Sequence, residues 1–336
     1  MKYEPPKFKT LHEMAFIDVC RLSEPQALHI LESIRWPEDP VCPHCKSKNV
    51  ARIKGKVKSV RDGLHRCYEC KQHFTVMVGT IMEDSHITYR QWIQAFHSMC
   101  SHKKGVSALQ LQRNLGLGSY RTAWHLAHRI RFAMQEGPLA GALKGIVEVD
   151  ETWVGGKPGR PKKDKKGKVI PNQKGFGPNG TNKTPVVALI ERNGRARSGP
   201  VEYVCAKTLK GVIRENVDKA STIMTDESKC YKGIGKEFGG GHESVNHSIR
   251  EYSKGEEIAI TTNSAESYFA LLKRGVHGTF HHVSKKHLHR YCDEFSFRWS
   301  NRKKTDGERT EMAVSGIEGK RVPYKKLGTA LKGGEG

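Results

Sequence analysis

Two pairs of cysteines place the tightest constraint on how this chain folds. Cys42 and Cys45 form one pair, and Cys67 and Cys70 form a second pair with the same C-x2-C spacing. Thiolates at this spacing hold one metal ion from a tight turn, and two such pairs complete the closed tetrahedral site typical of structural zinc. We therefore predict one structural Zn²⁺ at these four cysteines, with short strands joining the two turns.

The remaining cysteines are scattered and form no such motif, so we predict that they are buried thiols and not ligands. The start of the chain has no apolar core typical of a secretion signal, and no run approaches the roughly 18 apolar residues that a membrane span requires. We therefore expect a cytoplasmic protein without a membrane partner, in which metal binding is favoured over disulfides. The scattered cysteines are Cys20, Cys100, Cys205, Cys230 and Cys292.

The chain carries a large excess of positive charge, which is spread over most of its length. It has 58 Lys and Arg residues against 35 Asp and Glu residues, a formal net charge of +23. Such a field attracts polyanions and suits sustained contact with phosphates. DNA or RNA is the partner that this charge favours, although a ribosome-associated or merely basic protein has the same balance. Charge alone does not identify the chemistry.

Helical patterns stand on both sides of the cysteine pairs. The apolar spacing predicts helix within 11–35 and three helical segments between residues 89 and 135. A glycine-rich turn at 116–118, with Ser119 as N-cap, gives the last two segments the pattern of a helix-turn-helix. An ordinary helical hairpin inside a core is the alternative. Near the start of the helix that would read DNA lie Tyr120, Arg121, Trp124 and His125.

After residue 138 the pattern changes to strands. Residues 146–150, 185–190 and 221–226 have the apolar and β-branched runs of buried strands, and residues 209–217 have helical spacing. This alternation predicts a mixed α/β domain. Between the first two strands, residues 157–183 are rich in Lys, Arg, Gly and Pro, and we predict a basic flexible loop there.

Three carboxylates stand where predicted strands end and a predicted helix begins. Asp150 and Asp226 come at the ends of strands, and Glu266 opens a helix. Phosphodiester chemistry with two divalent cations needs such a cluster, because hard Mg²⁺ prefers oxygen ligands. Lys273 lies two helical turns beyond Glu266 on the same face, where it could meet a DNA phosphate. Taken singly, each acid is more often a solvated surface group.

Other acids and histidines lie close to these three in the sequence. We place Glu148, Glu151 and Glu227 outside the metal site, because neighbours on a strand point to opposite faces. His247 lies in a predicted strand at 244–248 and could contact substrate. A core or surface histidine explains that residue equally well.

Several stretches resemble bacterial insertion-sequence transposases of the ISXO-like group, which belong to the three-carboxylate (DDE) class. The resemblance runs from about residue 20 to residue 302, and the family likewise places a zinc ribbon first. The stretches that carry it are residues 147–157 (VEVDETWVGGK), 225–227 (TDE), 262–266 (TNSAE), 271–284 (LLKRGVHGTFHHVS) and 291–302 (YCDEFSFRWSNR).

The resemblance implies a ribonuclease-H-like fold, with Mg²⁺ or Mn²⁺ at three carboxylates and with cleavage and strand transfer at the inverted-repeat ends of a mobile element. By position, Asp150, Asp226 and Glu266 match the family's metal ligands, and Lys273 matches the basic residue beyond the glutamate. Some members carry asparagine at the third position, so Asn263 is an alternative ligand one turn before Glu266. We favour Glu266, because a carboxylate binds Mg²⁺ more strongly.

Double-stranded DNA is the partner that the resemblance implies, at the element ends and at the target. We expect a nucleoid-associated protein that forms a homodimer or a larger oligomer on DNA. Lys273, Arg274 and the basic loop would hold the strands, and Tyr120 and Arg121 would help to read the ends. Two alternatives stay open: a transposase-derived DNA-binding regulator without catalysis, and a structure-selective ribonuclease-H-like nuclease.

The predicted fold class is α/β, with the catalytic domain preceded by zinc-binding and helical DNA-binding regions. Its predicted parts are a helical lead-in at 1–38, a zinc ribbon at 39–82, a helix-turn-helix-like region at 83–137, a catalytic domain at 138–305 and a basic tail at 306–336.

Overall fold

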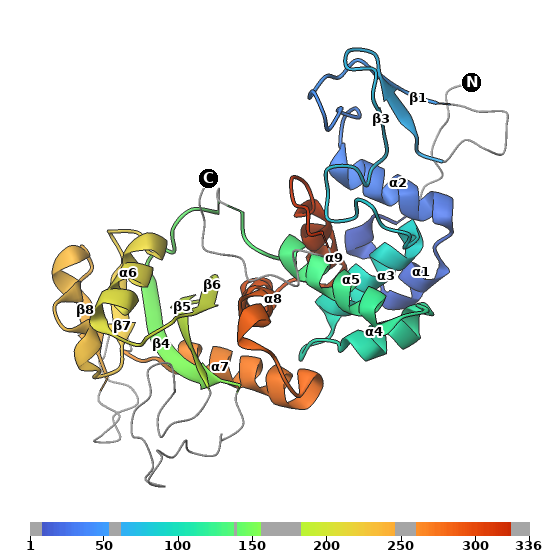
Figure 1. Cartoon of the computed structure of the whole chain (residues 1–336). Coiled ribbons are helices and arrows are strands. Elements are labelled where there is room, and N and C mark those ends of the chain that lie inside the picture. Colours follow the sequence, from blue (N-terminus) through green and yellow to red (C-terminus); the bar gives the residue numbers. More distant parts are fainter. Residues whose placement is uncertain (1–8, 54–61, 138–139, 156–182, 246–259, 324–336) are drawn as a thin grey trace, which may run out of the picture. The chain divides into compact units, whose positions relative to one another are not determined.

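The chain forms two compact units. The computed structural model describes residues 9–53, 62–137, 140–155, 183–245 and 260–323 (Figure 1). The first unit consists of described residues from Met1–Gln135 and Lys303–Gly336, and the second consists of described residues from Glu136–Arg302. His247 and all but the last residue of the basic loop predicted at 157–183 lie outside the described residues. No helix among the described residues is long and apolar enough to cross a membrane.

Helices dominate the first unit, and α3 is its centre. This helix contacts α1, α2, α4, α5 and α9. Its apolar face is fully buried, as the helical spacing predicts: Trp92, Ile93, Phe96 and Met99 have no exposed surface. The helices of this unit are η1 (Leu11–Glu13), α1 (Phe16–Arg21), α2 (Glu24–Arg35), α3 (Tyr89–Ser101), α4 (Ala108–Leu115), α5 (Tyr120–Ala133) and α9 (Asp306–Ser315).

A small antiparallel sheet carries the cysteine pairs of the first unit. Its strands are β1 (Val50–Arg52), β2 (His65–Cys67) and β3 (His73–Phe74), with β2 in the centre. Phe74 is buried and stacks on the ring of His65, whose centroid lies 5.4 Å away. The short strands predicted between the two cysteine pairs are therefore present.

The chain end differs from the tail predicted at 306–336, because residues 306–315 form helix α9. A capping box starts this helix: Thr305 Oγ1 accepts the N–H of Glu308 at 3.2 Å, and the Glu308 carboxylate accepts the N–H of Thr305 at 2.7 Å. Ala313 and Val314 are fully buried. Contacts with α3 and η1 place α9 in the first unit. The helix carries three acids and one arginine, so the basic character predicted for the tail does not hold for its first ten residues.

The second unit is built on one five-stranded sheet with the order β6-β5-β4-β7-β8. β4 pairs antiparallel with β5 and parallel with β7, β5 pairs antiparallel with β6, and β7 pairs parallel with β8. The strands are β4 (Ile146–Val154), β5 (Thr184–Glu191), β6 (Ala196–Pro200), β7 (Thr222–Thr225) and β8 (His242–Ser244).

The strands predicted at 146–150, 185–190 and 221–226 are present as β4, β5 and β7. Asp226 follows the end of β7 as predicted, but β4 continues to Val154, so the prediction that Asp150 ends its strand is wrong. β6 was not predicted, because Ala-Arg-Ser-Gly-Pro lacks apolar alternation and lies at a sheet edge, where glycine and proline are tolerated. The strand predicted at 244–248 begins earlier, as β8 at His242–Ser244.

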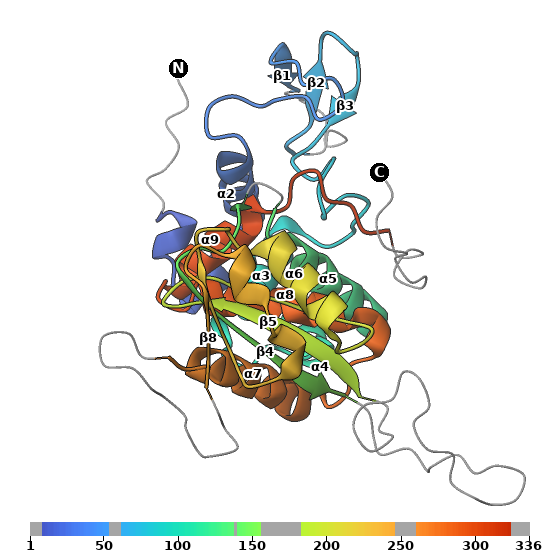
Figure 2. The same ribbon diagram turned by 90° about the vertical axis from the view of Figure 1, so that its left-hand side faces the viewer.

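Helices cover both faces of this sheet. One face packs against α6 (Ala206–Asn216), through Leu209 and Ile213. The other packs against α7 (Asn263–Gly275) and α8 (Leu288–Ser300). Figures 1 and 2 show α6 and α7 on opposite sides of the strands. Shorter helical turns complete this unit: η4 (Lys229–Tyr231), η5 (Ile234–Glu237), η7 (a π-helical turn, Val276–Phe280) and η8 (Lys285–His287).

The prediction that the five scattered cysteines are buried is wrong for two of them. Cys100 and Cys292 are buried and Cys230 is partly buried, but Cys20 and Cys205 are exposed. Cys20 lies on the six-residue helix α1, where Val19 is the buried residue. Cys205 is the N-cap of α6, at the end of the helix and outside its apolar face.

Candidate active site and metal centre

The four predicted cysteine ligands converge in the first unit. Their sulfur atoms all lie within 4.8 Å of one another. Cys42 Sγ lies 3.6 Å from Cys70 Sγ, and Cys45 Sγ lies 3.5 Å from Cys67 Sγ. Four thiolates bound to one ion at about 2.3 Å lie roughly 3.8 Å apart at tetrahedral angles. The cluster therefore fits one tetrahedral metal ion.

Matching turns hold the two cysteine pairs. Lys46 and Lys71 follow the second cysteine of each pair, and both have a φ of 61°. Cys42 N–H donates to Ser47 O at 2.9 Å, and Cys67 N–H donates to Gln72 O at 3.0 Å. Backbone hydrogen bonds thus form the two turns that bring the thiols together.

One thiol of the cluster is poised to lose its proton. Burial raises the pKa of Cys67, but backbone hydrogen bonds with Cys70 and Glu69 and contacts with neighbouring thiols lower it overall, to about 7. Backbone hydrogen bonds also lower the pKa of Cys70 and that of Cys45, but burial and the neighbouring thiols outweigh them, raising the pKa of Cys70 to about 12 and also raising that of Cys45. Cys67 is therefore the first of these three thiols to become a thiolate, the form that binds metal.

Sheet register brings the two predicted aspartates together in the second unit. On the adjacent parallel strands β4 and β7, Ile146 pairs with Thr222 and Glu148 pairs with Met224. Continuing this register by two residues places Asp150 beside Asp226, which directly follows β7. Asp150 also pairs with Ala188 on β5, a residue of the core on the α7 side of the sheet. Because cross-strand partners share a face, Asp150 faces α7.

The third carboxylate reaches the same place from α7. Glu266 lies in the first turn of this helix and is exposed, as are Asn263 and Lys273 on the same helical face. Burial raises the pKa of Asp150 to about 7 against a hydrogen bond from the N–H of Glu151. The negative charges of Asp226 and Glu266 add to this rise, so both groups lie near Asp150.

These three carboxylates are less tightly grouped than the cysteines. Among the described residues, the group whose ligand atoms all lie within 4.8 Å is the cysteine cluster, and the carboxylates do not meet that limit. Asp226 is held from its own loop, since its Oδ1 accepts the N–H of Ser228 at 3.1 Å. The three acids are thus close enough for their charges to interact, without forming a compact ligand cluster.

The placement of Glu148 away from the face of Asp150 is wrong. Two residues separate them on β4, so both side chains point to the α7 side; Glu148 pairs with Ile190, which belongs to that core. Glu148 is fully buried and bonds to Ser264 on α7. Because side chains two residues apart on a strand share a face, the sequence itself already indicated that Glu148 and Asp150 point the same way.

Glu151, by contrast, points to the other face. It pairs with Val187, which belongs to the core on the α6 side. Its carboxylate accepts the hydroxyl of Tyr231 at 2.5 Å. Burial raises the pKa of Glu151, a hydrogen bond from Tyr231 lowers it and the charge of Asp226 raises it. Glu227 is exposed.

The two helices predicted on either side of the turn at 116–118 are present as α4 and α5, which contact each other. Gly116 ends α4 with a φ of 62°, and Ser119 Oγ caps α5 by accepting the N–H of Arg121 at 3.1 Å. Tyr120 is 51% exposed and Arg121 is exposed, so both side chains are available to a partner. His125 Nε2 lies 3.0 Å from the carbonyl oxygen of Val322.

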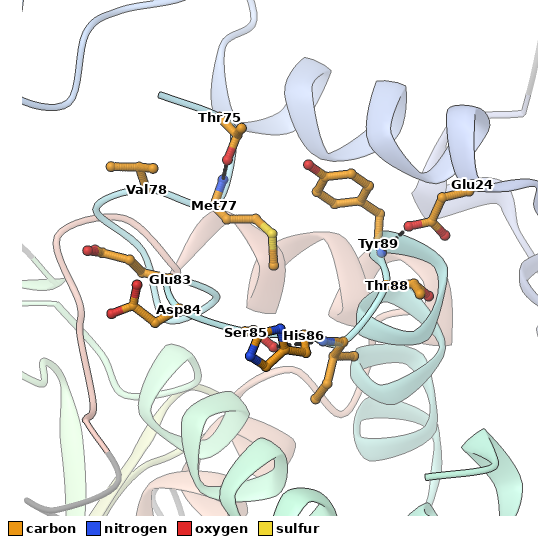
Figure 3. Close-up of a pocket in the computed structure, with 11 residues that line it drawn as sticks. Glu24, Thr75, Met77, Val78, Glu83, Asp84, Ser85, His86, Thr88 and Tyr89 are labelled. Carbon is orange, nitrogen blue, oxygen red and sulfur yellow. Dashed lines mark hydrogen bonds between the residues drawn. The ribbon is translucent and has the colours of Figure 1, made fainter. Parts of the chain in front are cut away.

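The pockets of the first unit include one beside the start of α3 and one beside α5. One, of about 690 Å³, lies beside the start of α3, where Glu24 accepts the N–H of Tyr89 at 2.6 Å (Figure 3). None of the predicted site residues lines it. The other, of about 510 Å³, is lined by Arg121 of α5 together with Arg129 and Arg321. The second pocket therefore places basic groups beside the predicted recognition helix.

Comparisons with known proteins agree with this arrangement. Residues 142–300 match the ISXO2-like transposase domain, and residues 22–73 match the transposase zinc-ribbon domain. A protein of Halobacterium salinarum, described as an uncharacterized protein in transposable element ISH50, is 26% identical over 279 residues, which cover 82% of this chain and 91% of that protein. The two domains define an insertion-sequence transposase. Within that class, the matched catalytic-domain model is the ISXO2-like one, which confirms the resemblance found in the motifs.

Proposed function

We propose that this transposase binds the terminal inverted repeats of its insertion sequence and carries out Mg²⁺-dependent DNA cleavage and strand transfer at Asp150, Asp226 and Glu266. The observation that carries the proposal is that the β4–β7 register sets Asp150 beside Asp226, and that Glu266 on α7 is close enough for its charge to act on Asp150. Acids that raise one another's pKa are matched to a divalent cation, whose charge relieves their repulsion.

The sheet supports a ribonuclease-H-like assignment for the second unit. The first three strands along the chain pair antiparallel with their neighbours, β4 with β5 and β5 with β6. On the other side of β4, β7 pairs parallel with β4, and β8 pairs parallel with β7. This order places the parallel strands β4 and β7 side by side in the sheet. Asp150 lies in the middle of β4 and Asp226 directly follows β7, so the register sets the two aspartates beside each other, as the proposed chemistry requires.

Each site residue has a role in the proposed mechanism. Divalent cations bound there would activate the attacking hydroxyl and stabilise the leaving oxygen. Asp150 and Asp226 would hold cations from the rigid sheet, and Glu266 would close the site from α7. Lys273 and Arg274, both exposed on α7, would hold DNA phosphates near the scissile bond. Asn263 lies one turn before Glu266 and is the alternative third ligand.

The first unit would supply DNA recognition. Cys42, Cys45, Cys67 and Cys70 would hold a structural Zn²⁺ in the ribbon, consistent with the soft sulfur donors. Tyr120 and Arg121 would contact the element ends from α5, within a DNA-binding region at 83–137. Double-stranded DNA is the proposed partner, and a homodimer or larger oligomer would pair two element ends.

Single substitutions at the carboxylates test the proposal. Asp150→Ala, Asp226→Ala and Glu266→Ala should each abolish cleavage and strand transfer in the presence of Mg²⁺ and leave DNA affinity largely intact. Asn263→Ala in parallel ranks the two third ligands. Retained activity in either aspartate variant would refute the mechanism. Cleavage without joining would indicate a nuclease, and DNA binding without cleavage by the unaltered chain would indicate a regulator.

A further inference from the structure

Glu148 connects the strand that carries Asp150 to the helix that carries Glu266. Its Oε2 accepts the backbone N–H of Ser264 at 2.7 Å and that of Ala265 at 3.2 Å. Its Oε1 accepts the Ser264 hydroxyl at 3.1 Å. A carboxylate that accepts these N–H groups does the work of an N-cap side chain, here supplied from a distant strand. Negative charge at this end of a helix is also favourable.

These bonds fix the turn from which Glu266 projects. Ser264 and Ala265 are the second and third residues of α7, whose N–H groups have no partner within the helix. The next N–H, that of Glu266, donates to Thr262 O at 3.0 Å and begins the helical ladder. Glu266 therefore follows directly on the two residues that Glu148 holds, and its position relative to β4 depends on them.

Arg192 completes the connection. It follows β5, and its guanidinium nitrogens Nε and Nη2 lie 3.1 and 3.0 Å from Glu148 Oε1. Nη2 also lies 3.5 Å from the carbonyl oxygen of Thr261, just before α7. Burying such an ion pair carries a desolvation penalty that an apolar pair would avoid. The hydrogen bonds of Glu148 and Arg192 to the residues at the start of α7 instead fix the position of this helix end on the sheet.

A glutamate also caps a helix of another segment at α3, but that helix carries none of the candidate metal ligands. Glu24 of α2 accepts the N–H of Tyr89 at the start of α3 at 2.6 Å (Figure 3). It also accepts the N–H of Arg90 at 3.1 Å. There it docks one helix on another. On α7, the helix that is docked carries the third acid of the candidate site.

We infer that Glu148 is a positioning residue, which sets the separation of Asp150 and Glu266 and thereby the affinity of the site for a divalent cation. This inference rests on the proposed function. Partners that orient metal ligands typically change metal affinity or activity by roughly 10–100-fold when they are removed. Glu148 does not touch the cation; it acts through the helix that presents Glu266.

The test is a Mn²⁺ titration of the zinc-loaded full chain, with free Mn²⁺ followed by electron paramagnetic resonance. Glu148→Gln keeps the size of the side chain and removes its charge. Glu148→Asp keeps the charge but shortens its reach toward Ser264 and Ala265. Both variants should bind Mn²⁺ roughly tenfold or more weakly than the unaltered chain and should lose kcat for cleavage, while KM for DNA stays unchanged.

Glu294→Gln is the matched control. Glu294 is also fully buried and paired with an arginine, Arg298, at 2.6 Å, but both residues lie within α8. Its loss should lower the melting temperature and leave Mn²⁺ affinity unchanged. If Glu148→Gln fails to fold, Glu148→Asp decides the matter.

Mn²⁺ affinity within twofold of the unaltered chain in a folded Glu148 variant would overturn the inference, as would an equal loss in Glu294→Gln. Asp150→Ala separates this failure from a failure of the proposed function. If the unaltered chain and Asp150→Ala bind Mn²⁺ alike, the carboxylate site itself is refuted. If Asp150→Ala loses the ion and the Glu148 variants keep it, only the positioning role fails.

Discussion

Replacing Asp150 by asparagine should make the cation-free protein more stable while it abolishes catalysis. Burial, together with the negative charges of Glu151, Asp226 and Glu266, raises the pKa of Asp150 from 3.8 to about 7. An ionised carboxylate is therefore held where the fold disfavours it. Asparagine has nearly the same shape and carries no charge, so Asp150→Asn removes this penalty.

The size and the sign of the effect follow from the pKa. It lies about three pH units above the value of 3.8, and each unit is equivalent to about 1.4 kcal/mol, so the upper limit is about 4 kcal/mol. Between about pH 4 and pH 7 the folded protein keeps the proton and the unfolded chain has lost it. The stability of the unaltered protein thus falls as pH rises through this window, and the full penalty is present above pH 7.

Calorimetry of the full chain in cation-free buffer at pH 5.5 and pH 8 measures the difference. For a unit of this size, 1 kcal/mol changes the melting temperature by about 2–4 °C, so we expect Asp150→Asn to gain up to about 10 °C at pH 8 and clearly less at pH 5.5. Added Mg²⁺ should stabilise the unaltered protein and not the variant. Glu215→Gln, on the exposed side of α6, is the control for loss of a charge. An equal gain at both pH values, or no gain, would refute the reasoning.

Three other predictions concern the ribbon, the DNA contacts and the packing of α7. Cys42→Ser with Cys67→Ser should reduce bound zinc from about one ion per chain to none by elemental analysis; unchanged zinc would contradict the ribbon site. Tyr120→Ala with Arg121→Ala should weaken binding to the element ends more than to random DNA, whereas Lys273→Ala should weaken both and lower the salt slope by roughly one; equal effects on both DNAs would count against recognition by α5. Gly275→Ala would force a Cβ into the ring of Phe295 and should destabilise the protein by about 1–3 kcal/mol in thermal melts, with partial rescue by Phe295→Leu.

Many elements of this protein could be predicted from short-range patterns in its sequence. The C-x2-C spacing predicts a cluster whose turns are made by backbone bonds within a few residues, and the structure has that cluster. The strands β4, β5 and β7 and the helices α4 and α5 follow from the periodicity and capping of nearby residues. In each case the forces that decide the structure act between neighbours along the chain, so the local sequence contains them.

Contacts between segments that are far apart in the sequence could not be predicted from local patterns. Glu148 lies 116 residues before Ser264, and nothing near either residue specifies that they meet. Helix α9 packs on α3 across more than 200 residues, as the bond from Cys100 to Arg309 illustrates. Strand β6 forms because β5 offers it an edge. These features depend on which apolar faces are buried together when the core packs. The free energy of burial comes from the sum of contacts over the whole chain, so no single segment specifies them.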